Sequence, residues 1–304
     1  MDILVCIQHN FVMPCGVLLL SLITNNSQEE VHIHCICNRD VTDDDKQSLR
    51  KIVEGKAQNS IQYYTFQTKH IDSYPGLRGT HFGESTYYRL FSSSILPTDI
   101  HRILYLDSDM IINGSINDLY ATDIKGYAVA GITNPMTEKQ MRRINKYLDA
   151  SDVYINGGVL LINLDYWRSH RVESAFVDFI EKDPQWILFV DQDVLNVVLK
   201  GKIKLLPIKY NFQYKFIYED KYLNKLLKNQ YGELREARED PVVVHFTGPD
   251  KPWMNHCEHP FRELFERYQN KTEWKGVVYK IPTKDFLRRK LCNFIKTLFK
   301  RRTL

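Results

Sequence analysis

Short apolar runs alternate with amphipathic segments along the chain, and this alternation limits the possible fold more than any other feature. Residues 3–7 form an apolar run with the length of a strand, and residues 15–22 follow with helical character. The pattern repeats with a strand at 31–37, a helix capped near Thr42 and a strand at 61–66. Such alternation predicts an α/β fold with a mainly parallel sheet covered by helices on both faces. Further predicted strands are 102–106, 127–132, 159–163 and 242–245, and further predicted helices are 84–93, 138–147, 172–182 and 191–199.

The length and composition indicate one large domain with an appended segment. The 304 residues are 43% hydrophobic and 26% charged, which is ordinary for a globular protein. We expect a domain at residues 1–270 and a C-terminal extension at 271–304. No apolar run approaches the roughly 20 residues that a membrane-spanning helix needs. The first residues lack the basic flank and unbroken apolar run of a secretory signal, so we expect the protein in the cytoplasm.

The positive charge is concentrated at the C-terminal end. Residues 285–304 contain seven Lys or Arg and one acid, whereas the remaining chain has 34 basic and 36 acidic residues. This distribution argues against nucleic-acid binding by the body of the protein. Apolar residues of the tail fall largely on one predicted helical face, which is typical of an interfacial helix on an anionic membrane. The alternative is a C-terminal helix that docks on the domain with a solvated basic face.

The cysteine pattern predicts reduced thiols. Six cysteines, at positions 6, 15, 35, 37, 257 and 292, show neither a disulfide-framework spacing nor a Cys-x-x-Cys pair. Cys35 and Cys37 would share one face of a strand. We interpret them as buried thiols, with metal binding as the alternative.

Two aspartates two residues apart follow the predicted strand at 102–106. Asp107 and Asp109 flank Ser108 between apolar runs, where an unpaired carboxylate is costly to bury. Hard oxygen ligands of this kind suit Mg²⁺ or Mn²⁺, and the end of a strand is where ligands gather in open α/β sheets. The alternative is an ordinary turn, in which Asp and Ser are common.

A second strand end offers groups that would complete such a site. His245 follows a run of valines and can supply a nitrogen ligand. Gly248 lets backbone approach a phosphate, and Lys251 supplies a point charge for it. By itself, a histidine at a strand end is more often a structural residue.

Five motifs in order make the chain similar to glycosyltransferase family 8, especially the bacterial lipopolysaccharide galactosyltransferases and glucosyltransferases. The motifs are residues 85–90, 104–109, 154–164, 191–196 and 245–253. The resemblance covers residues 1–260 and implies a GT-A fold, a UDP-hexose donor and retention of anomeric configuration. It also implies a glycan or lipid-linked glycan acceptor. Together with the basic amphipathic pattern of the tail, this favours peripheral attachment at the cytoplasmic face of the inner membrane through residues 285–304.

The resemblance assigns roles to individual residues. It implies that Asp107, Asp109 and His245 bind Mn²⁺, or alternatively Mg²⁺, and that Asp191 and Gln192 are catalytic. The positions that it assigns to donor binding are Gln8, Asn10, Arg89, Asp107, Ser108, Asn156, Asp191, Gln192, Gly248 and Lys251.

Some of these positions have simpler explanations or depart from the family. A turn before a strand also explains residues 156–158, and a helix N-terminus explains residues 191–193. Gln8 stands where relatives often carry Asp, and its amide oxygen can still accept a hydrogen bond from uracil. Asn134 stands where the galactosyltransferases tend to have Asp, which leaves glucose and galactose open.

Two other classes of protein remain as alternatives. A phosphatase of the haloacid dehalogenase type also binds Mg²⁺ through an Asp-x-Asp motif after a strand, but that motif normally follows the first strand. A non-catalytic sugar-nucleotide-binding protein would have no need for the combination of Asp107, Asp109, His245 and Lys251.

Overall fold

The computed structural model describes residues 1–66, 74–75, 84–149, 151–217, 223, 227 and 230–280. The chain divides into two compact units, Met1–His245 and Phe246–Leu304. The domain boundary that we expect at residue 270 stays a prediction. The basic tail at 285–304 and Cys292 lie outside the described residues. Within the part of the chain that the structure describes, every helix is too short or too polar to cross a bilayer.

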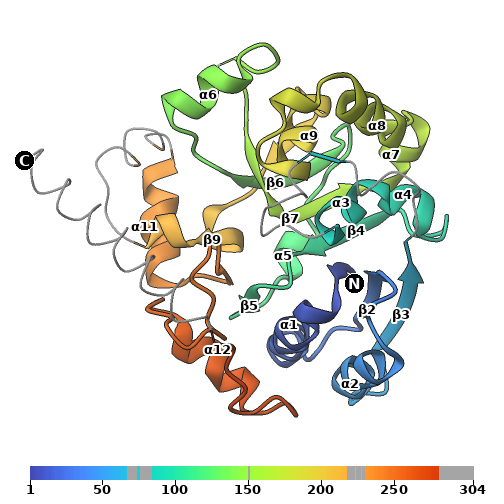
Figure 1. Ribbon diagram of the computed structural model, residues 1–304, viewed down its shortest axis with the longest axis vertical. Coiled ribbons are helices and arrows are strands. Elements are labelled where there is room, and N and C mark those ends of the chain that lie inside the picture. The colour runs from blue at the N-terminus through green and yellow to red at the C-terminus, as the bar shows by residue number, and fades with distance from the viewer. Residues whose placement is uncertain are drawn as a thin grey trace, which may run out of the picture. The chain divides into compact units, whose positions relative to one another are not determined.

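A seven-stranded sheet forms the centre of the first unit (Figure 1). Its strand order is β3-β2-β1-β4-β7-β6-β8. The strands are β1 (Asp2–Ile7), β2 (His32–Cys37), β3 (Ser60–Thr65), β4 (Arg102–Leu106), β6 (Val129–Thr133), β7 (Ile155–Asn163) and β8 (Ile203–Leu205). All described neighbours pair in parallel except β7, which runs antiparallel to both β4 and β6. The reversed β7 therefore brings its first residues to the edge where the other strands end.

A smaller sheet lies in the same unit and carries His245. Its order is β5-β10-β9, with β5 (Met110–Ile112), β9 (Phe212–Gln213) and β10 (Val243–His245). β10 runs antiparallel to β5 and parallel to β9. Since β5 follows the Asp107–Asp109 segment directly, pairing with β10 places His245 opposite Met110, next to Asp109.

Helices cover both faces of the large sheet. Figure 1 shows α1 and α2 on one side of it and α3, α4 and α7–α9 on the other. The α-helices are α1 (Val12–Asn25), α2 (Asp43–Val53), α3 (Ser85–Tyr88), α4 (Ser92–Ile95), α5 (Asn117–Tyr120), α6 (Glu138–Ile144), α7 (Leu164–Ser169), α8 (Val172–Lys182), α9 (Val190–Val198), α11 (Tyr231–Glu239) and α12 (Arg262–Gln269). Short 3-10 turns are η1 (His9–Phe11), η3 (Arg89–Phe91), η4 (Pro184–Trp186), η5 (Ile208–Asn211) and η6 (Tyr214–Phe216).

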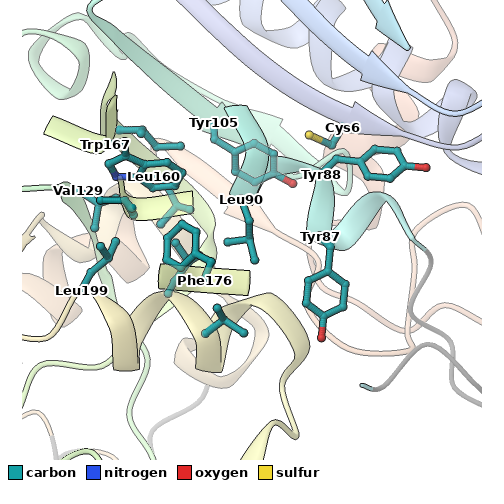
Figure 2. Packing of buried hydrophobic residues seen from close by; sticks show 14 of the residues in the cluster. Cys6, Tyr87, Tyr88, Leu90, Tyr105, Val129, Leu160, Trp167, Phe176 and Leu199 are labelled. Carbon is teal, nitrogen blue, oxygen red and sulfur yellow. The ribbon is translucent and has the colours of Figure 1, made fainter. Parts of the chain in front are cut away.

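The burial of β1 shows why its sequence is uniformly apolar. Residues 3–7 are all buried, although successive side chains of a strand face opposite sides. Leu4 and Cys6 join the cluster that contains Tyr87 and Trp167 (Figure 2), while the alternate side chains face the other layer of helices. A central parallel strand that is covered on both faces needs such a continuous apolar run.

Several elements begin and end where the sequence predicts. β4 and α8 match the predicted ranges 102–106 and 172–182. The predicted cap of α2 is confirmed, since Thr42 Oγ1 accepts a hydrogen bond from the Asp45 backbone N–H at 3.2 Å. Cys6, Cys15, Cys35, Cys37 and Cys257 are buried free thiols, in agreement with our interpretation.

One predicted helix is divided in the structure, and one alternative explanation is wrong. The helix expected at 84–93 is divided into α3, η3 and α4, and the 3-10 turn in its middle carries the buried Arg89. The turn that was the alternative explanation for residues 156–158 is not found, since these residues form the beginning of β7. These residues stay extended because β7 continues to pair with β6 as far as Ile155, beyond a register shift in β6.

Candidate functional site

Asp107, Asp109 and His245 converge at the carboxyl edge of the large sheet. His245 Nε2 lies 3.2 Å from Asp109 Oδ1 and 3.6 Å from Asp107 Oδ2. Potential ligand atoms of the three residues all lie within 4.8 Å of one another. The imidazole is almost fully buried, whereas a quarter of the Asp107 side chain is exposed. The cluster is therefore buried on the His245 side and partly open to solvent at Asp107.

The donor set suits a hard divalent cation. Two carboxylates and one imidazole are typical ligands for Mn²⁺ and acceptable ones for Mg²⁺. Two carboxylates this close repel each other unless a cation, a proton or a charged neighbour compensates their charge. The residues present thus match the metal that the sequence predicts, while its binding and identity stay predictions.

Gly158 makes room for this cluster. A Cβ atom at this position would lie 2.4 Å from His245 Cε1 and 2.8 Å from both Asp107 Oδ2 and Met110 Cε. The Gly158 carbonyl also accepts a hydrogen bond of 2.9 Å from the Asp107 backbone N–H. A residue without a side chain is therefore needed where β7 passes the carboxylates.

Arg89 connects the Asp107–Asp109–His245 cluster with the N-terminus of α9. Its guanidinium lies 3.0 Å from Asp107 Oδ1 and 3.2 Å from Asp191 Oδ2, and it stacks 4.1 Å from the Tyr105 ring centroid. It also donates a hydrogen bond to the Gly157 carbonyl at 2.5 Å. Burial opposes the charge of Arg89, but Asp107 and Asp191 outweigh it and raise the pKa of the guanidinium. Arg89 is therefore a permanent buried cation between two acids.

Asp191 is the other buried partner of Arg89. Burial raises the pKa of this carboxyl to about 7, Arg89 opposes the rise, and Asp107 adds to it. The contact with Arg89 Nε has the distance of an ion pair but lacks the alignment of a hydrogen bond. The preceding Val190 has a φ of +42°, which costs on the order of 1–3 kcal/mol for a β-branched residue. Strain of this kind is common where a fold holds a functional group in place.

Asn156 and Gln192 form an amide pair beside Arg89. Asn156 Nδ2 donates to Gln192 Oε1 at 3.0 Å, and the Gly157 backbone N–H donates to the same oxygen at 3.1 Å. Gln192 Nε2 donates to the Tyr154 hydroxyl at 3.1 Å. Both ends of the Gln192 amide are thus held by neighbours.

Asp191 and Asp193 both lie in the first turn of α9, as the helix N-terminus interpretation expects, but their contacts differ. Asp193 Oδ2 accepts hydrogen bonds from the Leu188 and Phe189 backbone N–H groups at 2.7 and 2.8 Å and pairs with Arg143 at 2.9 Å. These contacts close the loop before α9. Asp193 is therefore structural, whereas Asp191 points toward Arg89.

The remaining predicted positions lie at the end of β1, between the two aspartates in sequence, or in the second unit. Gln8 and the exposed Asn10 follow the end of β1, at the sheet edge where Asp107 follows β4, and Ser108 is buried between the two aspartates. Gly248, with a φ of +86°, and Lys251 belong to the second unit. Their expected contacts with a nucleotide stay predictions.

Three residues of the site are absent from the sequence prediction. Tyr105 donates a hydrogen bond to Asp107 Oδ1 at 2.5 Å, and Tyr154 supports Gln192. Each stands two residues before a predicted site residue, so strand periodicity was a usable signal for both. Asn211 contacts His245 Nδ1 at 2.9 Å from a different element, and no local pattern indicates this.

Solved glycosyltransferases share this fold. The chain matches the galactosyltransferase LgtC in complex with donor and acceptor sugar analogs at a TM-score of 0.78 and 22% identity, over 90% of this chain and 96% of that chain. It matches the glycosyltransferase GlyE of Streptococcus pneumoniae TIGR4 at a TM-score of 0.67 and 21% identity, over 91% and 61% of the two chains. The predicted GT-A architecture, an α/β fold with a mainly parallel mixed sheet, is confirmed.

The sequence places the chain in a family. The model of glycosyl transferase family 8 matches residues 2–257, so the chain belongs to this family and is a glycosyltransferase. Relatives are General stress protein A of Bacillus subtilis, 27% identical over 91% of this chain and 96% of that protein, and a lipopolysaccharide 1,2-glucosyltransferase of Escherichia coli, 28% identical over 90% and 79%. A lipopolysaccharide 1,3-galactosyltransferase of Salmonella typhimurium is 26% identical over 88% and 77%. Neither the phosphatase nor the non-catalytic alternative is supported.

Replacing Gly158 by alanine should reduce affinity for Mn²⁺. The added methyl group overlaps His245 and Asp107, so the ligands must move apart. We expect Mn²⁺ binding, measured by electron paramagnetic resonance, to weaken at least about tenfold, as misplaced ligands generally cause. Gly232→Ala is the control, because nothing lies within 4 Å of a Cβ there. Equal Mn²⁺ affinity in both variants would contradict the crowding argument.

The raised pKa of Asp191 predicts a pH-dependent stability. Because the folded protein holds this proton more tightly than the unfolded chain, the contribution is fully present below pH 4 and is lost as pH rises through about 7. Urea unfolding between pH 4 and pH 8, with EDTA present, should show the wild type losing stability relative to Asp191→Asn across this range. Parallel pH profiles for the two proteins would show that Asp191 titrates as it does in the unfolded chain.

Proposed function

We propose that this glycosyltransferase transfers a hexose, glucose or galactose, from a UDP-sugar to a glycan acceptor with retention of anomeric configuration. The observation that carries the proposal is the convergence of Asp107, Asp109 and His245 beside the buried Arg89–Asp191 pair. The curated relatives named as lipopolysaccharide glucosyl- and galactosyltransferases support a role in lipopolysaccharide or other surface polysaccharide synthesis.

The three clustered ligands would hold Mn²⁺, with Mg²⁺ as the second choice. A divalent cation there supplies electrostatic compensation for the negative charge that the departing UDP acquires. The two carboxylate oxygens of Asp107 would have different roles. Oδ2 faces the proposed metal position, and Oδ1 pairs with Arg89. We infer that this division orients the carboxylate for metal binding.

The donor sugar would lie against Arg89, Asn156, Asp191 and Gln192. Their amide, carboxylate and guanidinium groups are suited to hydroxyl recognition. Gln192 is a poor nucleophile, since a neutral amide lacks charge and Oε1 already accepts two hydrogen bonds. We therefore propose front-face attack: the bond from C1 to the phosphate oxygen breaks, and the acceptor oxygen bonds to C1 on the same face. The departing phosphate takes the acceptor's proton, and Gln192 stabilises the oxocarbenium-like state.

The donor and the metal can be tested together. UDP binding to the full chain, measured by isothermal titration with and without Mn²⁺, should be at least tenfold tighter with the metal. A panel of UDP-sugars should then show slow hydrolysis of UDP-glucose or UDP-galactose. Asp109→Asn should lower that rate by about a hundredfold or more, because a metal ligand is lost.

The matched control is Asp149→Asn, which removes a largely exposed carboxylate that pairs with Lys200. It should retain the wild-type rate. Full hydrolysis in EDTA would exclude the metal role, and an inactive wild type with every UDP-sugar would exclude the donor class.

We further propose that residues 285–304 attach the protein to an anionic membrane surface at the cytoplasmic face of the inner membrane. The support is their seven basic residues, with apolar residues at helical spacing. Such attachment brings an enzyme to lipid-linked acceptors.

Deleting residues 285–304 should release the protein from anionic liposomes in a sedimentation assay and leave UDP-sugar hydrolysis intact. Replacing Arg288, Arg289 and Lys290 together by Gln should weaken binding about a hundredfold, at about 1 kcal/mol for each charge. Neutral liposomes serve as the control. Continued sedimentation of the truncated protein with anionic liposomes would contradict the proposal.

A further inference from the structure

A continuous chain of hydrogen-bonded side-chain amides links His245 to Gln192 of helix α9. His245 Nδ1 lies 2.9 Å from Asn211 Oδ1, and Asn211 Nδ2 donates to Asn156 Oδ1 at 2.9 Å. Asn156 Nδ2 in turn donates to Gln192 Oε1 at 3.0 Å. Asn211 and His245 are 0% and 3% exposed, so water does not compete for the hydrogen bond between them.

The direction of every hydrogen bond in this chain follows from one backbone group. The Gly158 N–H can only donate, and it points at Asn156 Oδ1 at 2.9 Å. This fixes the Asn156 oxygen toward Asn211, so Asn211 must present its amino group there and its oxygen to His245. Nδ1 of His245 therefore carries a proton, and Nε2, which faces the two aspartates, is the nitrogen left to bind a metal.

We propose that Asn211 is a positioning residue with two functions. Its oxygen holds His245 in the tautomer that binds the metal, and its amino group holds Asn156, and through it Gln192, for the donor sugar. The second function rests on the proposed UDP-sugar chemistry, whereas the first needs only the metal.

Two substitutions separate the two functions. Asn211→Leu removes both hydrogen bonds and frees the imidazole to adopt the other tautomer. Asn211→Asp keeps an oxygen for the His245 Nδ1–H but places an acceptor against Asn156 Oδ1, so only the link to the donor side is lost. Asn26→Leu is the matched control, because Asn26 is also a buried asparagine with two backbone hydrogen bonds, to Ile116 and Leu22, away from the site.

The first readout is Mn²⁺ affinity of the full chain without nucleotide, measured by electron paramagnetic resonance. We expect Asn211→Leu to bind Mn²⁺ about 10- to 100-fold more weakly, the usual effect of losing the hydrogen bond behind a metal-bound histidine. Asn211→Asp should bind Mn²⁺ at least as well as the wild type. Asn26→Leu should lose thermal stability but keep its Mn²⁺ affinity.

The second readout is the rate of UDP-sugar hydrolysis at saturating Mn²⁺. Asn211→Asp should lower kcat about tenfold or more with metal affinity intact, a split that simple destabilisation does not produce. Wild-type Mn²⁺ affinity in Asn211→Leu, or equal loss of affinity in Asn211→Leu and Asn211→Asp, would overturn the assignment. Asn211→Ala replaces the leucine variant if that protein does not fold.

The two proposals can fail separately. If the wild type binds Mn²⁺ but hydrolyses none of the UDP-sugars, the proposed donor class is wrong, and the Mn²⁺ comparison still decides the tautomer role of Asn211. If hydrolysis is normal in Asn211→Asp, the donor-side function of Asn211 is wrong while the proposed glycosyl transfer stands.

Discussion

The site depends on the ion pairs that the buried guanidinium of Arg89 forms with two aspartates. The guanidinium lies within ion-pair distance of Asp107 and Asp191, which come from different parts of the chain and would otherwise leave two carboxylates in a region of low dielectric. Removing one partner from such a buried set typically costs 3–5 kcal/mol, because the remaining charge is left uncompensated. The network thus requires β4, the α3–α4 segment and α9 to assemble together, and the same charges are then available to a ligand.

The antiparallel direction of β7 is the second feature on which the site depends. Because β7 runs opposite to β4 and β6, its first residues, Asn156, Gly157 and Gly158, lie at the edge where the parallel strands end. Backbone rather than side chain occupies the space beside His245, so the Asp107 backbone N–H can donate to the Gly158 carbonyl while the Asp107 carboxylate faces His245. Residues 156–158 thus let backbone approach the carboxylates closely and also fix the hydrogen-bonded amides of Asn211, Asn156 and Gln192. Gly158 and Asn211 therefore shape the site, although neither is expected to touch the donor.

The sequence predicted most of the framework because its signals are local. The period of the apolar residues defined β1, β2, β4 and α8, and the Thr42 cap located α2. At residues 84–93 the predicted helix is divided into three segments around the buried Arg89, and residues 156–158 lie in β7, where pairing with β6 continues as far as Ile155. Burial and strand pairing are properties of the whole fold, so helical spacing and glycine content in a short window cannot report them.

For the site, the sequence by itself determined the chemical types: two carboxylates after a strand, a histidine at the end of another, and polar groups at the beginnings of β7 and α9. Only the tertiary structure decided which of them meet. It separated Asp191 from Asp193, gave one to Arg89 and the other to a helix cap, and brought Asn211 behind His245 across 34 positions of sequence. The physical reason is that hydrogen bonds and ion pairs act over a few ångströms in space, whereas a motif records only distance along the chain.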